Sequence, residues 1–408
     1  MKRLLFVHGG KGIGGAPLTL LAIIKSLDRS RYTPHVLCLY ESEAADLFRS
    51  EGIETEIGKG IYHLAHTTGV WYPVHYMPML FYRLFLFPVS LINAYRYLSR
   101  HHFDIVHLNG SGLLSFAIAA RLRHIPVLLH VLEHLHHGYF GFRRFVLSRL
   151  LTGFSNAAVF ICKSDASMFP RSLKIHIIYD SIDPDRFDPD RPATVSKSAV
   201  GIPEDAMVVG MLGGISHIKG TLEFVKAAAG VVRSVTDVHF LILGYSQEGN
   251  EQPRKANFIT AFKQKLSGEE KYRSKVLSEA DVEPLKGKIH FLPSTLDVAS
   301  IIKMLDVLVF PSTTPHYARP LIEAGMMKKA VVASRLGGPD EIVIDGLNGY
   351  LVTACDPGEL SNKIVTLLKD AALREHMGIA GRTRAMEMFN SRKNIPEILK
   401  LYDVIEAK

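Results

Sequence analysis

The feature that most constrains the fold is an alternation of apolar strand-like segments with amphipathic helical patterns. In the first half of the chain the helical patterns are clearest at 17–27, 45–53 and 113–123. The segments between them are apolar at successive positions, which predicts parallel strands buried on both faces by helices. These segments are 3–7, 35–40, 103–110, 126–133, 156–162 and 174–180.

The alternation stops in a stretch rich in Pro, Asp and Ser at 184–205 and then restarts. The second set of strand-like segments is 207–214, 238–244, 288–293, 307–312, 330–334 and 349–352. We therefore expect two Rossmann-like α/β domains. Parallel sheets of this kind bind ligands at the carboxyl ends of their strands, so we expect the two sheets to face an interdomain cleft.

The expected domains are residues 1–187 and 201–390, joined by a linker at 188–200, with a C-terminal helix at 391–408 returning to the first domain. A chain of 408 residues is too long for one ordinary core and suits this division. The first residues, MKRLLFVHGG, contain too short an apolar run for a signal peptide and predict a buried first strand. Three widely spaced cysteines suit a reducing compartment, so we expect a cytoplasmic protein.

The net charge of +8 is compatible with a nucleic-acid or an anionic membrane partner. No zinc-finger, RNP or helix-turn-helix pattern occurs, so we expect no nucleic acid. Between Ile57 and Phe103 there is no Asp or Glu, and Arg and Pro interrupt an aromatic segment at 71–95. This pattern predicts a helix in the membrane interface, on the inner face of the cell membrane. A groove for an apolar acceptor or a buried hairpin would have a similar composition. The candidate residues are Trp71, Tyr72, Tyr76, Phe81 and Arg83.

Three segments at the ends of predicted strands carry candidate binding residues. The loop 9–16 is glycine-rich, and the backbone N–H groups around Gly14 and Gly15 could approach a phosphate at a helix start; a tight turn without a ligand would look similar. Lys219 lies at a helix start, where the helix dipole disfavours a cation. A bound diphosphate would reverse that penalty, and a solvated lysine in a loop is the equal alternative. Glu323 is the one acid in PHYARPLIEAG (315–325) and could accept the hydroxyls of a ribose, or could only favour the dipole of its own helix.

Six motifs in this order resemble the retaining glycosyltransferases of family 4, which have the GT-B fold. They are GGA (14–16), DIVH (104–107), HVLE (130–133), SIDPDRF (181–187), HIKG (217–220) and the run from Pro311 through AVVAS to Glu341. The resemblance extends over nearly the whole chain. It implies that Glu323 is the second acid of the family's E-x7-E pair, which holds the nucleotide ribose.

The chain departs from the family pattern at several of these positions. Pro315 stands where the first Glu of the pair is usual, Tyr317-Ala318 replaces Phe-Gly, and Gly214 stands where many members have an arginine that pairs with the diphosphate. By the resemblance, His316 or Arg319 could take over a contact to the sugar or phosphate. The backbone around Ala318 and Arg319 could still hold the transferred group.

The resemblance implies transfer of a sugar from a nucleoside-diphosphate sugar to a hydroxyl acceptor, with retention and no obligatory metal or cofactor; a lipid-linked acceptor is one candidate. Lys219, Gly14, Gly15 and, less directly, Arg319 would stabilise the leaving diphosphate. His130 would touch the donor sugar near the reacting centre, unless it is a core histidine. No pair of carboxylates suits a double displacement, and the DPD at 183–185 lies at the domain junction, so we expect no metal site.

Two other functions remain open from the sequence. A nucleotide-sugar 2-epimerase would share the fold but would need further acids in the cleft. A non-catalytic nucleotide-binding module would account for Pro315 and Gly214. The base, the sugar, the acceptor and the oligomeric state are not encoded in any motif found here.

Overall fold

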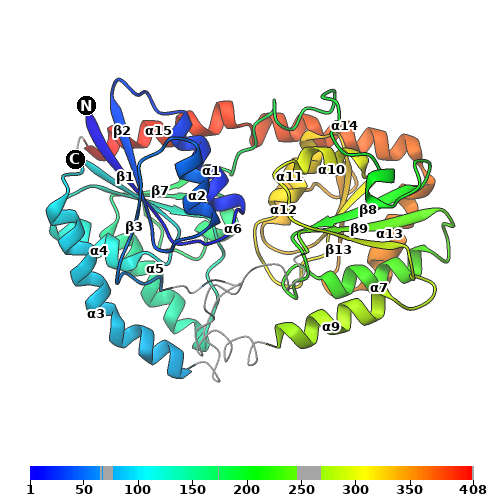
Figure 1. The fold of residues 1–408 in the computed structure, drawn as a ribbon, viewed down its shortest axis with the longest axis horizontal. Coiled ribbons are helices and arrows are strands. Elements are labelled where there is room, and N and C mark those ends of the chain that lie inside the picture. Colours follow the sequence, from blue (N-terminus) through cyan, green and yellow to red (C-terminus); the bar gives the residue numbers. More distant parts are fainter. Residues whose placement is uncertain (65–66, 68–76, 173, 246–267, 407–408) are drawn as a thin grey trace. The chain divides into compact units, whose positions relative to one another are not determined.

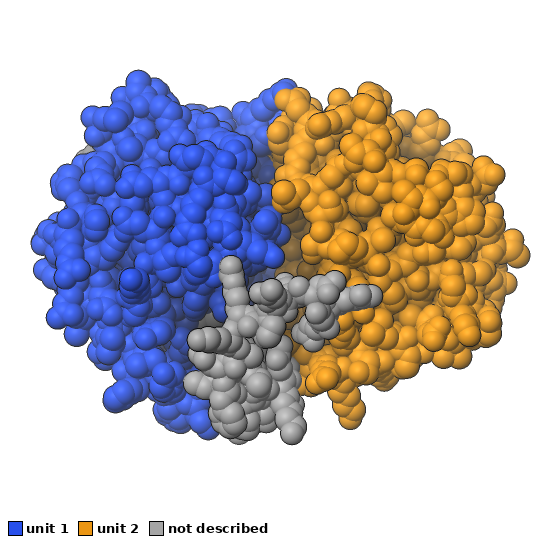
Figure 2. All heavy atoms as spheres, in the orientation of Figure 1, with its two compact units in different colours: residues 1–181, 390–408 blue, residues 182–389 orange. Residues whose placement is uncertain are grey.

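The computed structural model describes residues 1–408 except 65–66, 68–76, 173, 246–267 and 407–408 (Figure 1). Contacts divide the chain into two compact units, coloured in Figure 2: unit 1 is 1–181 with 390–408, and unit 2 is 182–389. The division falls at Ser181 rather than at the expected residue 187. The reason is that Ile182 and Phe187 are buried, and the Ile182 N–H donates to the carbonyl of Phe389 at 2.8 Å.

The expected linker, 188–200, also packs within unit 2. The N–H of Thr194 donates to Ser300 Oγ at 3.0 Å, and Lys197 Nζ donates to the carbonyl of Ala206 at 2.8 Å. The polar segment 188–200 is therefore a surface loop that hydrogen bonds attach to unit 2, and not a free linker between the domains.

Unit 1 contains a seven-stranded sheet in the order β3-β2-β1-β4-β5-β6-β7, with parallel pairing throughout. The order reverses between β1 and β4, which makes their carboxyl ends the topological switch point. The strands are β1 (Lys2–His8), β2 (Tyr32–Cys38), β3 (Thr55–Ile57), β4 (Ile105–Asn109), β5 (Val127–Val131), β6 (Ala157–Phe160) and β7 (Ile175–Ile177).

Helices cover both faces of this sheet. Leu20, Phe48 and Tyr402 represent one face, where α1 (Gly15–Lys25), α2 (Glu43–Ser50) and the C-terminal α15 (Ser391–Glu406) pack. Leu98, Phe116 and Leu151 represent the other, where α3 (Met77–Arg100), α4 (Leu114–Leu122) and α5 (Phe142–Phe154) pack. A 3-10 turn at Tyr139–Gly141 precedes α5, and the short α6 (Lys163–Ala166) follows β6.

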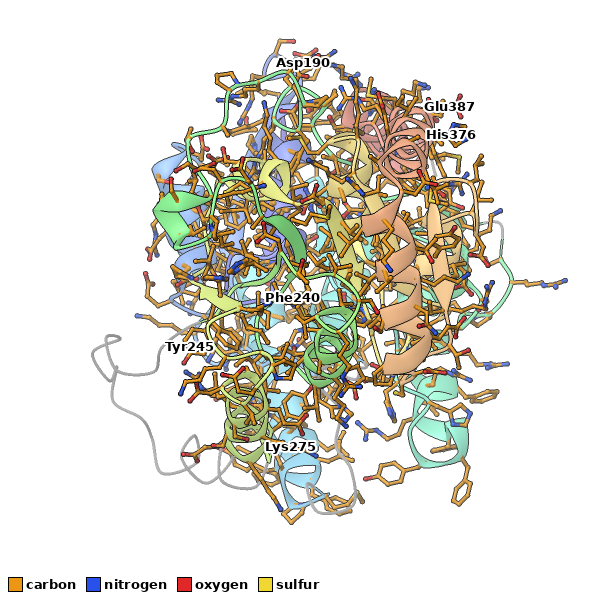
Figure 3. All side chains as sticks on the ribbon, turned by 90° about the vertical axis from the view of Figure 1, so that its right-hand side faces the viewer. Asp190, Phe240, Tyr245, Lys275, His376 and Glu387 are labelled. Carbon is orange, nitrogen blue, oxygen red and sulfur yellow. The ribbon has the colours of Figure 1, made fainter. Side chains whose placement is uncertain are left out.

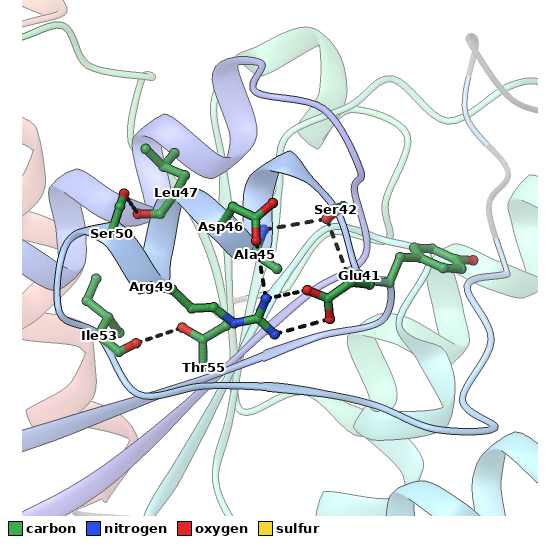
Figure 4. Close-up of polar contacts among 10 residues, drawn as sticks. Glu41, Ser42, Ala45, Asp46, Leu47, Arg49, Ser50, Ile53 and Thr55 are labelled. Carbon is green, nitrogen blue, oxygen red and sulfur yellow. Dashed lines mark hydrogen bonds and ion pairs between the residues drawn. The ribbon is translucent and has the colours of Figure 1, made fainter. Parts of the chain in front are cut away.

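Helix α2 shows how local sequence determines a helix start (Figure 4). Ser42 is the N-cap, and its Oγ accepts the N–H of Ala45. Asp46 in the first turn and Arg49 in the last turn suit the helix dipole. Arg49 also forms ion pairs with Glu41 and Asp46.

Unit 2 contains a six-stranded sheet in the order β10-β9-β8-β11-β12-β13, again with parallel pairing. Its switch point lies between β8 and β11. The strands are β8 (Met207–Leu212), β9 (Val238–Leu243), β10 (Ile289–Leu292), β11 (Val307–Phe310), β12 (Ala330–Ser334) and β13 (Gly349–Val352). The helices are α7 (Thr221–Val231), α9 (Glu269–Ala280), α10 (Val298–Met304), α11 (Arg319–Met326), α12 (Pro339–Ile342), α13 (Pro357–Lys369) and α14 (Ala371–Met388).

The core of unit 2 lies between this sheet and its helices. Phe240 of β9, labelled in Figure 3, is fully buried and packs edge-on against Phe224 of α7 at 5.9 Å between ring centroids. The two parallel-sheet Rossmann-like domains predicted from the sequence are therefore confirmed. Strand β3 was not predicted, because three residues are too few for a periodic signal.

Candidate active site

Two loops meet at the switch point of unit 2. Residues 213–220 follow β8 and residues 311–318 follow β11, and these strands are neighbours in the sheet. The N–H of Thr313 donates to the carbonyl of Ile218 at 2.9 Å, and its Oγ1 donates to the carbonyl of His217 at 2.8 Å. Gly220 is required here, since its φ is +72° and a Cβ would lie 1.8 Å from the carbonyl oxygen of Pro311.

Lys219 lies in the first of these loops. Its Nζ donates to the carbonyl of Gly213 at 2.9 Å, and burial lowers the pKa of its ammonium group. Across the described parts of the chain, no carboxylate forms an ion pair with Lys219. A partly buried cation without a counter-charge is a suitable site for an anionic ligand.

Gly214 contributes only backbone to this site. Its φ is +71°, and a Cβ would lie 2.3 Å from the carbonyl oxygen of Gly244. An arginine, which the family pattern has here, would clash with the backbone after β9. Gly213 is similarly constrained, because a Cβ there would lie 2.2 Å from Lys219 Nζ.

Glu323 lies in the second turn of α11, because that helix begins at Arg319. Its position is too far from the helix N-terminus for the dipole interpretation, which depends on the first turn. Its carboxylate is largely buried, and Oε1 accepts a hydrogen bond from Arg319 Nε at 3.0 Å. Arg319, expected to reach a sugar or phosphate, instead forms an ion pair with Glu323 across one helical turn.

The rest of the predicted 316–319 cluster surrounds the start of α11. The ring of His316 packs against Phe310 at 5.0 Å, and its Nδ1 lies 3.2 Å from the carbonyl oxygen of Thr314. Tyr317 follows, and Ala318 is the fully buried N-cap residue of the helix. Gly338 lies against this loop, since a Cβ there would be 2.6 Å from the carbonyl oxygen of His316. Lys219, Gly214, residues 316–319 and Glu323 therefore lie in two neighbouring loops and the adjoining helix at one end of one sheet.

Arg186 joins this site although the sequence analysis did not single it out. Its guanidinium donates to the carbonyl of Leu296, and burial lowers its pKa while the nearby Glu323 carboxylate partly offsets that shift. Arg186 is the only basic residue of the SIDPDRF motif, a signal that could have identified it.

A cavity of about 880 Å³ opens beside the Lys219 loop. Its walls come from 215–218, from Gly244 and Tyr245 after β9, and from the first turns of α9. Figure 3 labels two of its residues, Tyr245 and Lys275. The guanidinium of Arg273 lies 4.7 Å from the centroid of the Tyr245 ring, so a cation–π contact joins these two residues of the cavity wall.

The glycine-rich loop of unit 1 lies at the switch point of its own sheet. Gly14 is the N-cap of α1, and no atom lies within 4 Å of where its Cβ would be. Gly15 is the first residue of that helix, whose first turn contains no acid. The glycines at 9 and 112 have a different cause, since a Cβ at either would lie within 2.5 Å of the His63 ring.

His130 lies inside β5 and only 1 % of it is exposed. Its ring lies 5.4 Å from the ring of His107, whose Nδ1 is 2.7 Å from the Tyr402 hydroxyl of α15. Burial lowers the pKa of His130 to about 4. This geometry fits the alternative of a core histidine, because alternation along β5 turns the side chain toward α15.

Glu133, in the same HVLE motif, lies at the carboxyl end of the sheet instead. Its Oε1 accepts hydrogen bonds from the N–H and the hydroxyl of Ser111, each at 3.0 Å. Burial raises the pKa of this carboxyl group. Ser111 follows β4, so Glu133 links two loops beside the switch point of unit 1.

The predicted membrane residues are only partly described. Trp71, Tyr72 and Tyr76 lie outside the described residues. Phe81 is 61 % exposed on α3, whereas the guanidinium of Arg83 turns back over the ring of Tyr62 at 5.7 Å. Helix α3 is long and apolar enough to cross a membrane.

Comparison with known proteins relates both units to glycosyltransferases. Residues 13–186 match the family profile described as Glycosyltransferase Family 4, and residues 193–384 match Glycosyl transferases group 1. The matches leave only residues 187–192 between them. The solved structure of Anabaena Alr3699/HepE with UDP and glucose superposes with a TM-score of 0.77 over 99% of this chain and 100% of that one, at 20% identity. The glycosyltransferase WaaG, involved in lipopolysaccharide biosynthesis, gives 0.64 at 13% identity over 98% and 99%.

Curated relatives are distant in sequence. The Escherichia coli UDP-Gal:alpha-D-GlcNAc-diphosphoundecaprenol alpha-1,3-galactosyltransferase is 24% identical over 77% of this chain and 78% of its own length. The Corynebacterium urealyticum D-inositol 3-phosphate glycosyltransferase is 26% identical over 53% and 49%. Residues 13–186 thus match a glycosyltransferase family 4 domain and residues 193–384 match a group 1 glycosyltransferase domain, in the order expected from the sequence, and the fold is the GT-B fold of the solved structures.

Proposed function

We propose that this protein transfers a sugar from a nucleoside-diphosphate sugar to a hydroxyl acceptor with retention of anomeric configuration. The observation that carries the proposal is Lys219, a partly buried ammonium at the switch point of unit 2 without a carboxylate partner among the described residues. Relatives support the donor class: Alr3699/HepE was solved with UDP-glucose, and the E. coli relative is named for transfer from UDP-Gal.

Unit 2 would bind the donor. Lys219 binds the diphosphate, together with N–H groups of the loop at 213–220. Glu323 accepts the ribose hydroxyls, and Arg319 positions its carboxylate through the 3.0 Å hydrogen bond. Arg186 supplies positive charge beside the same acid, whereas Gly214 contributes no side chain to the site. The cavity beside Tyr245 has a volume within the range of small-ligand sites, about 300–1,000 Å³.

The reaction exchanges one C–O bond for another. The bond between the anomeric carbon and the diphosphate oxygen breaks, the acceptor oxygen bonds to that carbon on the same face, and the acceptor proton ends on the diphosphate. This route needs no metal and no second carboxylate; it needs stabilisation of the leaving diphosphate. Gly14, Gly15 and the N-terminus of α1 would add to that stabilisation if the two sheets face one cleft, which stays a prediction.

The HVLE motif contributes two residues, His130 and Glu133, to the proposed site, and their environments differ. The ring of His130 supports β5 from the core, and its contact with the donor sugar stays a prediction. Glu133 lies at the carboxyl end of the sheet and is the polar group better placed to orient an acceptor hydroxyl.

The acceptor would be lipid-linked and reached at an anionic membrane, on the cytoplasmic inner face. Neither 57–103 nor 134–164 contains an acid. Helices α3 and α5 lie on the same face of unit 1, and Tyr139 Oη donates to Met77 Sδ at 2.8 Å between their N-terminal ends. Helix α3 docks through Ser90, Ala94 and Leu98, which favours lying on the membrane over crossing it. The exposed apolar residues here are Phe81, Tyr82, Leu84, Phe85, Val89, Ile92, Tyr95, Phe140, Phe142, Phe145 and Leu150.

Flotation with liposomes tests the membrane part separately from the chemistry. We expect the protein to float with vesicles rich in phosphatidylglycerol at low salt, and Phe81→Ser with Phe85→Ser to reduce flotation while donor binding is unchanged. As a control, Ile379→Ser removes an apolar residue that is 52 % exposed from α14 of unit 2. No flotation of the unaltered protein would refute membrane contact and leave the transferase proposal standing.

A thermal-shift panel of nucleoside diphosphates, followed by donor hydrolysis, tests the donor proposal. A ligand at a hundred times its dissociation constant should add about 2.7 kcal/mol to the free energy of unfolding. A non-catalytic module, which Pro315 and Gly214 favour, would bind the nucleotide without hydrolysing or transferring the sugar. A 2-epimerase would release an altered sugar nucleotide without any acceptor.

A further inference from the structure

A buried histidine at the edge of the unit 1 sheet faces two carboxylates that come from a neighbouring strand. His35 lies on β2, Glu54 directly precedes β3, and Glu56 lies within β3. Val36 pairs with Thr55 in the parallel register, so alternation places His35, Glu54 and Glu56 on one face of the sheet. The site is remote in sequence from every motif used above.

The ring of His35 is enclosed on the side of the core. Only 1 % of the residue is exposed, and the rings of Phe103 and His101 lie 5.5 and 6.5 Å from it. The Tyr97 hydroxyl of α3 lies 2.9 Å from Nε2. The imidazole is therefore fixed, and the carboxylates of Glu54 and Glu56 lie between it and solvent.

The second nitrogen of this ring is not satisfied by hydrogen bonding. Among the described residues Nδ1 has no hydrogen-bond partner, although a Glu54 oxygen lies only 3.2 Å away. A Glu56 oxygen lies 3.5 Å from Nε2, and one ligand atom from each of the three residues lies within 4.8 Å of the others. A buried imidazole nitrogen without a partner is costly unless a ligand completes it.

The 3.2 Å between Nδ1 and the Glu54 oxygen suits two ligands of one metal ion, whereas the Glu56 oxygen lies nearer Nε2 and would move toward Nδ1 to complete the set. Ligand atoms of a tetrahedral Zn²⁺ lie about 3.4 Å apart when the bonds are about 2.1 Å long. One imidazole and two carboxylates make three protein ligands, which leaves one position for water. The Tyr97 hydroxyl contacts Nε2, the other nitrogen of the His35 ring, and a hydrogen bond at that position orients a histidine ligand. We propose that His35, Glu54 and Glu56 form a Zn²⁺ site that ties the edge strand β3 to β2, with Tyr97 as its positioning residue.

Such a site would be structural, and it does not depend on the proposed glycosyl transfer. Strand β3 has only three residues at the edge of the sheet, so it has little pairing of its own. A metal bound between β2 and β3 would hold that edge next to the end of α3, where Tyr97 lies in the last turn and His101 directly follows the helix.

Calorimetric titration of the chelator-treated full-length protein with ZnCl₂ tests this proposal. We expect one site at micromolar free Zn²⁺ and a rise in melting temperature on binding. Glu54→Gln with Glu56→Gln should weaken the site by more than about tenfold, and Tyr97→Phe should weaken it by about tenfold through the ring. The side chain of Glu54 is 61 % exposed and that of Glu56 is 41 % exposed, so the double variant should still fold.

Two controls distinguish this site from other zinc binding. Glu41→Gln removes an exposed carboxylate of the same unit that pairs with Arg49 and not with histidine (Figure 4), and Zn²⁺ affinity should be unchanged. Zinc held at the adjacent His239 and His290 of unit 2 would survive the double substitution. No saturable site in the unaltered protein, or equal affinity in the double variant, would overturn the proposal and leave an ion pair between His35 and its carboxylates.

Discussion

Replacing Lys219 by methionine is the most direct test of the donor site. Methionine keeps most of the length and apolar volume of the side chain and removes the charge. In the structure the ammonium contacts only the Gly213 carbonyl among described polar groups, so its removal breaks one protein hydrogen bond. We expect a large loss of diphosphate affinity with little loss of stability.

The magnitude follows from the environment of the ammonium group. A hydrogen bond to a charged group contributes about 1.5–3 kcal/mol, and burial of Lys219 favours the upper end of that range. About 3 kcal/mol corresponds to roughly a hundredfold weaker binding. Because burial lowers the pKa of Lys219, holding the charged ammonium costs the folded protein free energy, and this cost is fully present below the folded pKa and disappears as the pH rises above the unfolded value. The methionine variant should therefore melt at the same temperature or higher without ligand.

Calorimetry with the nucleoside diphosphate that gives the largest thermal shift, and with its parent nucleoside, measures this effect. The diphosphate should lose roughly a hundredfold in affinity, while binding of the nucleoside should change little. Lys226→Met on the exposed face of α7 is the matched control and should leave both unchanged. An unaltered diphosphate affinity in Lys219→Met, or an equal loss for the nucleoside, would refute the assignment.

Three further changes test other parts of the reasoning. Glu323→Gln should weaken the binding of the diphosphate and of the nucleoside alike, by about 2 kcal/mol or roughly thirtyfold, because it alters the proposed ribose contact and the hydrogen bond from Arg319. A calorimetric loss of affinity for the diphosphate alone would contradict this assignment. Gly214→Arg should lower the free energy of unfolding in urea by more than about 2 kcal/mol, because the φ of Gly214 is +71° and the Gly244 carbonyl oxygen occupies the space that a Cβ needs. A stable variant that binds the donor more tightly would show instead that the loop accommodates the arginine usual in the family. Since burial lowers the pKa of His130 to about 4, the unfolded state gains the proton first, and His130 alone should lower the free energy of unfolding by about 3 kcal/mol between pH 6.5 and pH 4. His130→Gln should remove that contribution in denaturant titrations at the two pH values, whereas an unchanged pH dependence would mean that the ring is not buried.

The sequence by itself determined the architecture and the positions along the chain of the residues proposed to bind the donor. The alternation of buried strands and helices leaves few arrangements other than parallel sheets, and ligands bind at the carboxyl ends of such strands. Lys219 and residues 316–319 directly follow predicted strands, so their location at one end of unit 2 could be predicted before any coordinates.

The tertiary structure decided which side chains meet at those ends. The 3.0 Å pairing of Arg319 with Glu323 depends on where α11 begins, and a helix start after a loop is not set by composition alone. Whether His130 or Glu133 is available to a ligand depends on which helix covers each face of β5, and α15 reaches that face from the opposite end of the chain. The cluster of His35 with Glu54 and Glu56 likewise follows from strand register. Sequence patterns report the period of a strand or helix, while the partners of a side chain are set by pairing and packing between distant segments.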